Sequence, residues 1–533
     1  MRIVAHALLR AASPFVGTLA LAAMCCGAEP VRLTPQPQKF RTFYSLDDPR
    51  VPAALKQPVA TLRAVASDGA VWYGTARGIT RVDPHAAPRD RNQYFAGKRY
   101  LPDDDVQQLI ADQAAGIWAR TKTGVSHIEL RTMTLAAKAA LFEERIRARH
   151  DRHGLVSPSN LRLPGDVSTS QMRDDDNDGL WTSMYAAAEC FRYAVTHSAE
   201  ALANATRSTE AVLFLEEVAG KRGFPARSYI RKGEPMPDSG EWQRTADGQY
   251  YWKGDTSSDE IVGHFLLYGV ATDLLPDVAL KKRIADTAAR IMDHIVGHGY
   301  YLIDVTGKPT TWGRWSQAYF KQEPGDSALN SMELLSFLKT AWHITGNARY
   351  ASEYRKVAMD LGYARRATRY KELGQEINYS DEELAMLSFY NLFRYETDRD
   401  LLERYYRPAL NAWWDNIVRE ENPLWDFIYG MAQPNAPVDM ASAARTLYRM
   451  PADTIEWTVT NSNREGMTMD PATGRFQRRQ AITLLPPDER PVMKWNSNPF
   501  DIDGGSGGRG EDDGAAFLLP YWMGRYLGLL LGE

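Results

Sequence analysis

The feature that most constrains the fold is a long series of amphipathic segments that begins near residue 131 and continues almost to the end of the chain. Their apolar residues recur at a spacing of about 3.6, the period of a helix that buries one face, as Val262, Leu266 and Val270 illustrate. The segments with this pattern are 132–150, 179–195, 199–219, 258–274, 278–296, 327–344, 348–361, 381–396, 399–419, 436–449 and 515–530.

Short links join these segments. Thr345-Gly346-Asn347 and Thr397-Asp398 each separate two helical segments by only a few residues, which favours antiparallel helical hairpins. Ser257 and Glu260 match a capping box, a signal for a helix start. About twelve helices paired as hairpins over roughly 400 residues predict a mainly α fold, an (α/α)6 toroid, over residues 131–533.

Residues 29–130 have a different pattern. Trp72-x-x-Thr75-x-x-Gly78-Ile79 recurs as Trp118-x-x-Thr121-x-x-Gly124-Val125, and each copy predicts a strand, a glycine turn and a second strand. These repeats resemble the blades of bacterial sensor-type β-propellers. Two blades cannot close a propeller, so we expect a small β domain appended to the helical part.

The first 28 residues match a secretory signal peptide. Arg2 and Arg10 precede an apolar stretch from Phe15 to Met24, and Cys26-Gly27-Ala28 provides small residues before a cleavage point at Glu29. Met24 and Cys25 fit a lipidation signal poorly. We therefore expect export to a bacterial periplasm or to the cell exterior, with Cys190 as the one remaining cysteine.

Charge excludes one class of partner. The chain has 63 Lys and Arg against 67 Asp and Glu, so it lacks the basic footprint of a nucleic-acid-binding protein. The last apolar segment is short and is interrupted by Pro520 and Arg525, which indicates a buried helix rather than a membrane span. The sequence does not indicate an oligomeric state.

Acidic or aromatic residues precede every second helical segment. In a toroid the inner helices run parallel, so these residues would meet at one mouth, although acids also favour helix N-termini as caps. The segments are Asp174–Gly179, Asp255–Glu260, Asp326 with Asn330, Asp381–Glu383, Trp425-Asp426 and Glu511–Asp513.

Aromatic residues concentrate in the inserts between helices. Trp312-Gly313-Arg314-Trp315 places a guanidinium between two indoles, where it could pair with a carboxylate of a substrate while an indole stacks on its ring. A cation–π pair that holds the loop is the simpler alternative. The predicted substrate-binding residues are Arg314, Trp312, Trp315, Tyr229, Trp252, Trp495 and Asn330.

These features together resemble (α/α)-toroid carbohydrate-active enzymes, both glycoside hydrolases and polysaccharide lyases. The resemblance covers residues 131–533 and rests on architecture and residue distribution rather than on a family signature. It implies a carbohydrate substrate bound in the mouth of the toroid.

Glycoside hydrolysis needs two carboxyl groups, one that donates a proton and one that activates water or attacks. The best candidates are Asp255 and Glu511, followed by Asp178 and Asp512. Asp255 precedes the capping box, so capping does not already employ it. A glycosidase is therefore the first hypothesis for the function.

Two alternatives remain open. A lyase would need a base such as His264 or Tyr301 and a group that neutralises a uronate, for which Arg314 and Asn330 are candidates. The other alternative is a non-catalytic glycan-binding or sensory protein, which the propeller-like repeats suggest.

The proposed chemistry requires no cofactor, and calcium is the one ion that the sequence suggests. Asp174, Asp176 and Asp178 alternate as in the first half of a calcium loop, but the twelfth position is Tyr185 rather than Glu. The glycine-rich run Gly504–Gly510 lacks the context of a nucleotide-binding loop or a nucleophile elbow, and it predicts a flexible loop.

Overall fold

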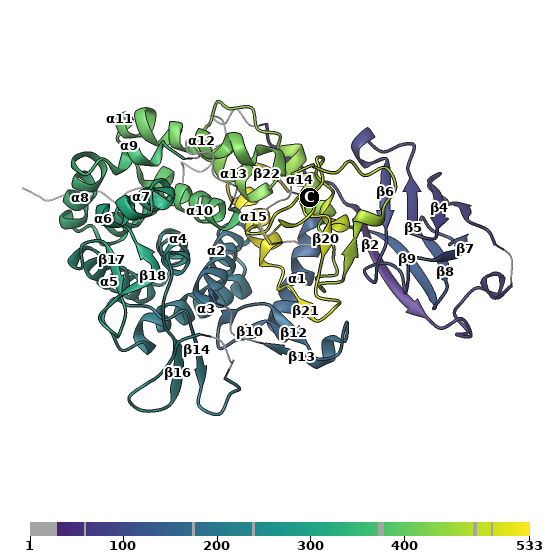
Figure 1. Ribbon diagram of the computed structural model, residues 1–533, viewed down its shortest axis with the longest axis horizontal. Coiled ribbons are helices and arrows are strands. Elements are labelled where there is room, and N and C mark those ends of the chain that lie inside the picture. The colour runs from purple at the N-terminus through teal and green to yellow at the C-terminus, as the bar shows by residue number, and fades with distance from the viewer. Residues whose placement is uncertain are drawn as a thin grey trace, which may run out of the picture.

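The computed structural model describes residues 29–57, 60–172, 176–236, 240–370, 378–472, 477–491 and 494–532. Six helices of the C-terminal part contact one another in a closed series (Figure 1): each contacts the next along the chain, and the last contacts the first. They are α2 (Asp178–Thr196), α4 (Ser258–Leu274), α7 (Ser327–Thr345), α10 (Tyr379–Tyr395), α13 (Pro423–Ala432) and α15 (Ala515–Tyr526).

The remaining helices pack around this series. The first of them, α1, packs on α15. The others lie against the ring helices that precede or follow them in the chain. They are α1 (Leu135–Arg149), α3 (Ala199–Val218), α5 (Val278–Gly297), α8 (Ala348–Arg355), α9 (Tyr363–Ala367), α12 (Arg407–Ile417) and α14 (Met440–Arg449), with the short α6 (Gln317–Gln322) and α11 (Arg399–Leu401) in the connections. A mainly α fold is therefore confirmed.

Burial explains which helices lie inside. In α7 every residue from Ala328 to Ala341 is buried, whereas α5 buries a stripe that includes Leu280, Ile284 and Ile291 and exposes charged residues elsewhere. A helix that is apolar on all sides must be surrounded by protein, and a helix with one apolar stripe can lie at the surface.

Helix α13 was missed by the sequence prediction, which assigned no helix to 423–432. Asn422 caps it by accepting a hydrogen bond from the Leu424 backbone N–H at 3.0 Å, and Pro423 occupies its first turn. An N-cap followed by proline is a helix-start signal.

The predicted capping box at the start of α4 is present only in part. Ser257 stands at the N-cap of α4, but its side chain makes no capping bond.

The N-terminal part consists of two four-stranded antiparallel sheets, and each sheet contains one copy of the sequence repeat. Their strand orders are β3-β4-β5-β6 and β2-β9-β8-β7. The strands are β2 (Gln36–Tyr44), β3 (Arg63–Val65), β4 (Val71–Thr75), β5 (Gly78–Val82), β6 (Asn92–Phe95), β7 (Val106–Ala111), β8 (Ile117–Thr121) and β9 (Val125–Met133). Trp72, Phe95 and Ile117 belong to the shared core.

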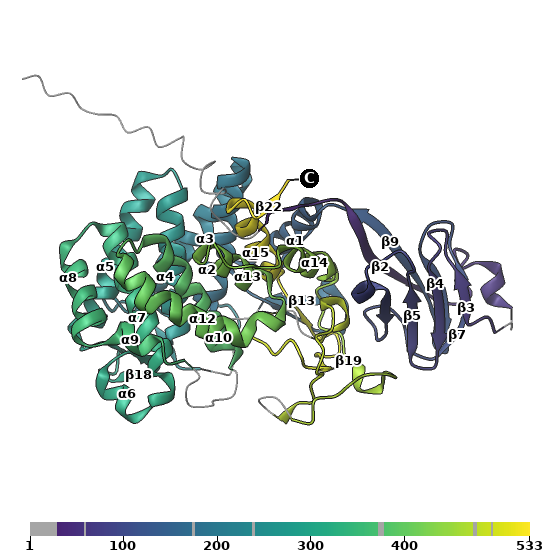
Figure 2. The same ribbon diagram turned by 90° about the horizontal axis from the view of Figure 1, so that it is seen from above.

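Figure 2 shows this β part beside the helical part, with β2 and β9 nearest to the helices. The chain passes directly from β9 into α1.

Short strands decorate the helical part. They are β1 (Val31–Arg32) with β22 (Leu530–Leu531), β10 (Asp151–Arg152) with β11 (Leu155–Val156), β12 (Ser159–Leu161) with β13 (Ser170–Met172) and β21 (Gly510–Glu511), β14 (Ser228–Arg231) with β15 (Trp242–Arg244) and β16 (Tyr250–Lys253), β17 (Tyr301–Ile303) with β18 (Pro309–Arg314), and β19 (Val459–Thr460) with β20 (Asp503–Gly504). Among the described residues, no helix has the length and apolar character needed to cross a membrane.

Candidate functional site

The N-terminal ends of the ring helices lie together at one end of the ring. Asn177, next to the start of α2, donates a hydrogen bond to Asp259 in the first turn of α4 at 3.4 Å. The negative charges of Asp259, Asp326 and Asp381, at the starts of α4, α7 and α10, all help to raise the pKa of Glu333. Groups that interact electrostatically in this way lie near one another.

Lys494 connects this group to the remaining helices. Its charge acts on Glu383 of α10 and on Asp513, which precedes α15. Its Nζ lies 4.2 Å from the ring centroid of Trp181 in α2. We call this end of the ring, with the residues around Lys494, the mouth.

Capping explains why carboxylates stand at these helix ends. Asp512 Oδ1 accepts a hydrogen bond from the Gly514 backbone N–H at 2.9 Å, and Asp513 Oδ1 accepts one from the Ala515 backbone N–H at 2.7 Å. These bonds satisfy donors that have no partner within α15. The second oxygen, Oδ2, of each carboxyl group accepts no hydrogen bond from any residue that the structure describes.

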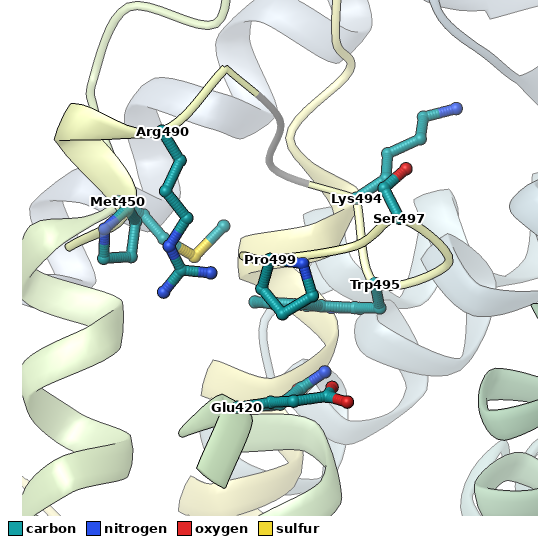
Figure 3. Close-up of a pocket in the computed structure, with 9 residues that line it drawn as sticks. Glu420, Met450, Arg490, Lys494, Trp495, Ser497 and Pro499 are labelled. Carbon is teal, nitrogen blue, oxygen red and sulfur yellow. The ribbon is translucent and has the colours of Figure 1, made fainter. Parts of the chain in front are cut away.

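Trp495 separates two small cavities in the mouth, and its side chain is only 8% exposed. On one side is a cavity of about 20 Å³ lined by Glu420, Arg490 and Trp495 among others (Figure 3). On the other side is a cavity of about 10 Å³ whose lining includes Trp181, Asp512 and Asp513. Both are far below the roughly 300–1,000 Å³ of a ligand pocket, so neither can hold a sugar unless its lining residues move.

Asp513 holds its proton more tightly than an ordinary aspartate. Burial and the nearby charge of Asp512 raise the pKa of Asp513 to about 6, against the opposing effect of Lys494. A carboxyl group whose pKa is raised by burial and by a neighbouring carboxylate can keep a proton at mildly acidic pH. Asp513 can therefore offer a proton in a cavity that it shares with a second carboxyl group.

A second carboxyl pair lies on the other side of Trp495. Burial and the charge of Glu382 raise the pKa of Glu420 well above its usual range, and the two groups share a hydrogen bond. Tyr370 donates a hydrogen bond to Glu382 at 3.1 Å and stacks on Trp413, with ring centroids 3.2 Å apart. The two glutamates are engaged by each other and by Tyr370, which suits a structural role in the wall of the mouth.

Glu333 and Glu383 lie in the second turn of α7 and of α10, respectively. Burial is the main cause that raises the pKa of each to about 8. Trp315 Nε1 donates a hydrogen bond to Glu333 Oε2 at 2.8 Å, while Oε1 of both glutamates is buried without a partner among the described residues. Both are therefore protonated at neutral pH.

Two of the predicted catalytic carboxylates hold ion pairs. Glu511 accepts two hydrogen bonds from Arg149, each 2.6 Å long, and the pKa of Glu511 is lowered to about 2 even though burial opposes this shift. Asp178 Oδ2 accepts hydrogen bonds from Arg152 at 2.6 Å and from the Ser228 hydroxyl. Glu511 therefore stays ionised and does not supply a proton. The Asp178 carboxylate is engaged by Arg152 and Ser228.

Asp255, the other leading candidate, holds the β17–β18 hairpin against the start of α4. Its carboxylate accepts hydrogen bonds from the Thr311 backbone N–H at 2.8 Å and the Thr311 hydroxyl at 2.9 Å. Of the four predicted carboxylates, Asp512 is thus the one that lines a cavity of the mouth.

Three of the four residues considered for a lyase meet at the β17–β18 hairpin. Tyr301 pairs with Arg314 across the hairpin, and Asn330 donates a hydrogen bond to the Arg314 carbonyl oxygen at 2.8 Å. His264 lies apart in the core, where its Nδ1 is 2.6 Å from the Glu260 carbonyl oxygen. Burial lowers the pKa of His264 to about 4, so this imidazole is neutral at physiological pH.

The predicted aromatic platforms differ in exposure. Trp312 is 55% exposed, whereas Trp315, Trp252 and Tyr229 are buried and have no free face on which a sugar could stack. Trp495 lines both cavities of the mouth. Their roles in binding stay predictions.

The suggested calcium ligands are only partly described, because Asp174 lies outside the described residues. Asp176 Oδ1 accepts a hydrogen bond from Lys253 Nζ at 2.5 Å, and Asp178 pairs with Arg152. Among the residues that the structure describes, no group of three or more His, Cys, Asp or Glu side chains could hold a metal ion.

Sequence reasoning did not single out Asp513, Lys494, Trp181 or Glu420. Asp513 stands last in a run of three acids, and nothing local distinguishes it from its neighbours. Two of these residues could have been found from the sequence. Lys494 directly precedes Trp495, and Trp181 closely follows the acidic segment Asp174–Gly179.

No protein-family model and no curated protein sequence matches the chain. A solved structure described as AaCel9A in complex with cellobiose-like isofagomine is similar over 88% of this chain and 99% of that chain, with 11% sequence identity and a TM-score of 0.36. A likeness this distant does not identify a function, so a function has to be inferred from the mouth itself.

Proposed function

We propose that the protein is an exported glycoside hydrolase with an (α/α)6-toroid catalytic domain, and that it cleaves an oligo- or polysaccharide in the mouth. The closed series of six contacting helices, each paired with an outer helix, supports the toroid. The signal-like residues 1–28 support export to the periplasm or cell exterior.

One observation carries the catalytic proposal: Asp512 and Asp513 line one cavity, and the pKa of Asp513 is raised to about 6 partly by the charge of Asp512. Hydrolysis of a glycosidic bond uses one protonated and one ionised carboxyl group. Asp513 would donate the proton to the leaving oxygen, and Asp512 would act as the second carboxylate. A carboxyl group whose environment raises its pKa fits the role of the proton donor.

Two indoles and an ammonium group frame this pair. Trp181 and Trp495 line the cavity with the two aspartates, and indole faces are suited to the apolar faces of sugar rings. Lys494 lies over Trp181 and near Asp513, where it can donate hydrogen bonds to hydroxyl groups. Substrate binding requires lining residues such as Trp495 to move, because the present cavity holds only about 10 Å³.

The test is a hydrolysis assay on a panel of soluble polysaccharides with the full mature chain, in which reducing ends and ultraviolet absorbance are both followed. We expect reducing ends without the absorbance of an unsaturated sugar. Asp512→Asn and Asp513→Asn should each lower kcat roughly 100- to 10,000-fold. Asparagine can still cap a helix, so both variants should keep their thermal unfolding midpoint.

The matched control is Asp286→Asn on the outer helix α5, where the exposed Asp286 pairs with Lys282. This variant should keep full activity. If the two mouth variants hydrolyse substrate at the rate of the control, the assignment of the pair is wrong. An unsaturated product would instead identify a lyase, and a glycan that binds without being cleaved would identify a binding protein.

A further inference from the structure

A third cavity, of about 230 Å³, lies where β2 of the β part meets α1 and the segment that follows α14. Its lining is rich in cations and includes Lys39, Arg41, Arg99 and Arg145, with Asp453 as the one carboxylate. It lies outside the mouth and shares no lining residue with the two cavities beside Trp495. We call it the interface cavity.

Two of its four cations are already neutralised. Lys39 forms an ion pair with Asp488, and Arg41 forms one with Asp453 at 3.0 Å. These pairs link the β part to the segments 451–455 and 487–491 of the helical part. Among the described residues, no carboxylate forms an ion pair with either of the other two guanidinium groups.

Arg99 is nearly inaccessible, with 3% exposure, and forms no ion pair with any described carboxylate. It donates hydrogen bonds to the carbonyl oxygens of Asp488 at 3.0 Å and Arg490 at 2.8 Å. Its Nε is buried and has no hydrogen-bond partner among the described residues. A buried guanidinium with an unused donor is costly unless an anion is available to it.

Arg145 on α1 likewise forms no ion pair with a described carboxylate, and its side chain is partly buried. Within the described part of the chain, its one hydrogen-bond partner is the Ala452 carbonyl oxygen, and burial lowers the pKa of Arg145. Asp453, Glu511 and Glu144 act on it through space. Asp453 and Glu511 are paired with Arg41 and Arg149 respectively, and Glu144 is exposed to solvent. The interface cavity therefore has a surplus of about two positive charges from groups that are partly removed from water.

We propose that the interface cavity binds a compact oxyanion of the phosphate or sulfate class through Arg99 and Arg145. Guanidinium groups form short, charge-assisted hydrogen bonds with such anions. A volume of 230 Å³ is many times the roughly 10–15 Å³ that one buried water needs, so it admits the anion together with several waters. The free ion and a phosphate or sulfate group on a sugar share this chemistry.

The neighbouring surface offers a useful contrast. A larger cleft of about 570 Å³ between β5, β2 and α14 is also rich in arginine. There Arg81 pairs with Asp68 and Asp83, and Arg445 and Arg449 share Asp90. Among the described residues, Arg32 is the arginine of that cleft without an ion pair, and it is exposed to solvent, whereas Arg99 is buried and Arg145 is partly buried.

The test is isothermal titration of the full mature chain with inorganic phosphate, inorganic sulfate, and a sugar phosphate or sugar sulfate, at constant ionic strength. We expect saturable binding of at least one of these and a rise in the unfolding temperature with its concentration. Arg145→Gln should weaken binding roughly 10- to 100-fold, because it removes charge-assisted hydrogen bonds. If only the sugar-linked groups bind, the ligand is a modified sugar; if the ions bind equally well, it is the free anion.

The control is Arg147→Gln on the same helix, which removes the same charge from an exposed side chain paired with Asp151. It should bind the anion like the unmodified chain. Arg99→Gln is the second variant, with its fold checked by circular dichroism because Arg99 is buried. Absence of binding by the unmodified chain, or equal binding by Arg145→Gln and Arg147→Gln, would overturn the proposal. Neither result depends on whether the mouth hydrolyses glycans.

Discussion

Replacing Glu333 by glutamine should flatten the pH dependence of stability. Glu333 is fully buried in α7, where Trp315 Nε1 donates a hydrogen bond to its Oε2 at 2.8 Å. Burial and the charges of Asp259 and Asp381 raise its pKa from 4.5 to about 8. The amide side chain of the Glu333→Gln variant would keep an oxygen for the indole and would carry no ionisable proton.

The sign follows from linkage. In the unfolded chain Glu333 ionises near its ordinary pKa of 4.5, whereas in the folded chain it stays protonated up to about 8. The folded state therefore binds more protons between these pH values, and stability is lost as pH rises through this window. At about 1.4 kcal/mol per pH unit, the free energy of unfolding falls by up to roughly 5 kcal/mol across this window. Rearrangement of the protein around the ionised Glu333 makes the actual loss smaller.

The assay is guanidinium unfolding followed by tryptophan fluorescence at a series of pH values from 5 to 9. The difference in midpoint between the unmodified chain and Glu333→Gln isolates this group from others that titrate in the same window, such as Lys39 with its pKa lowered to about 8. Glu210→Gln on α3 is the control, because Glu210 is exposed. A midpoint difference that does not change with pH would refute the reasoning.

Three further outcomes are expected. Hydrolysis should decline as pH rises through about 6, because Asp513 must be protonated to donate; a pH–rate profile checks this, and a rate that holds up to pH 8 contradicts it. Arg149→Gln should lower the unfolding free energy by roughly 3 kcal/mol, because it removes the guanidinium that pairs with the buried Glu511 and leaves His150, 3.4 Å away, as its neighbouring cationic group; chemical denaturation measures this, and a loss below about 1 kcal/mol would show that His150 or another group replaces Arg149. Treatment with a chelator should leave the unfolding temperature unchanged, because Asp176 and Asp178 are held by Lys253 and Arg152; a drop that calcium reverses would restore the calcium prediction.

The helices could be predicted because their signals are local. The period of the apolar residues and the short links depend on neighbours in the chain, and they predicted most of the helices. The sequence prediction missed α13 because it is a ten-residue helix in which nearly all residues are buried. Its apolar residues give no one-sided pattern, so only Asn422 and Pro423 indicated its start.

The choice among carboxylates could not be made from the sequence, because it depends on partners that are distant in the chain. Glu511 and Arg149 are 362 positions apart, and their ion pair separates Glu511 from its neighbour Asp512 in chemical character. Likewise, Asp255 is engaged by Thr311, 56 positions away. Three adjacent acids look alike in sequence, and only the packing of α1 against the start of α15 distinguishes them.

The position of the β part follows from the same long-range contacts. Lys39 of β2 and Arg449 of α14 hold the pKa of Asp488 well below its usual range, and Arg99 binds the carbonyl oxygens of Asp488 and Arg490. Arg490 in turn lines the cavity beside Trp495. The wall of the mouth is therefore built on a segment whose charges are satisfied from the β part. Removal of the β part would leave Asp488 with one of its two cations and would expose the buried side chains of that segment, so the two parts must act as one structural unit for the mouth to keep its shape.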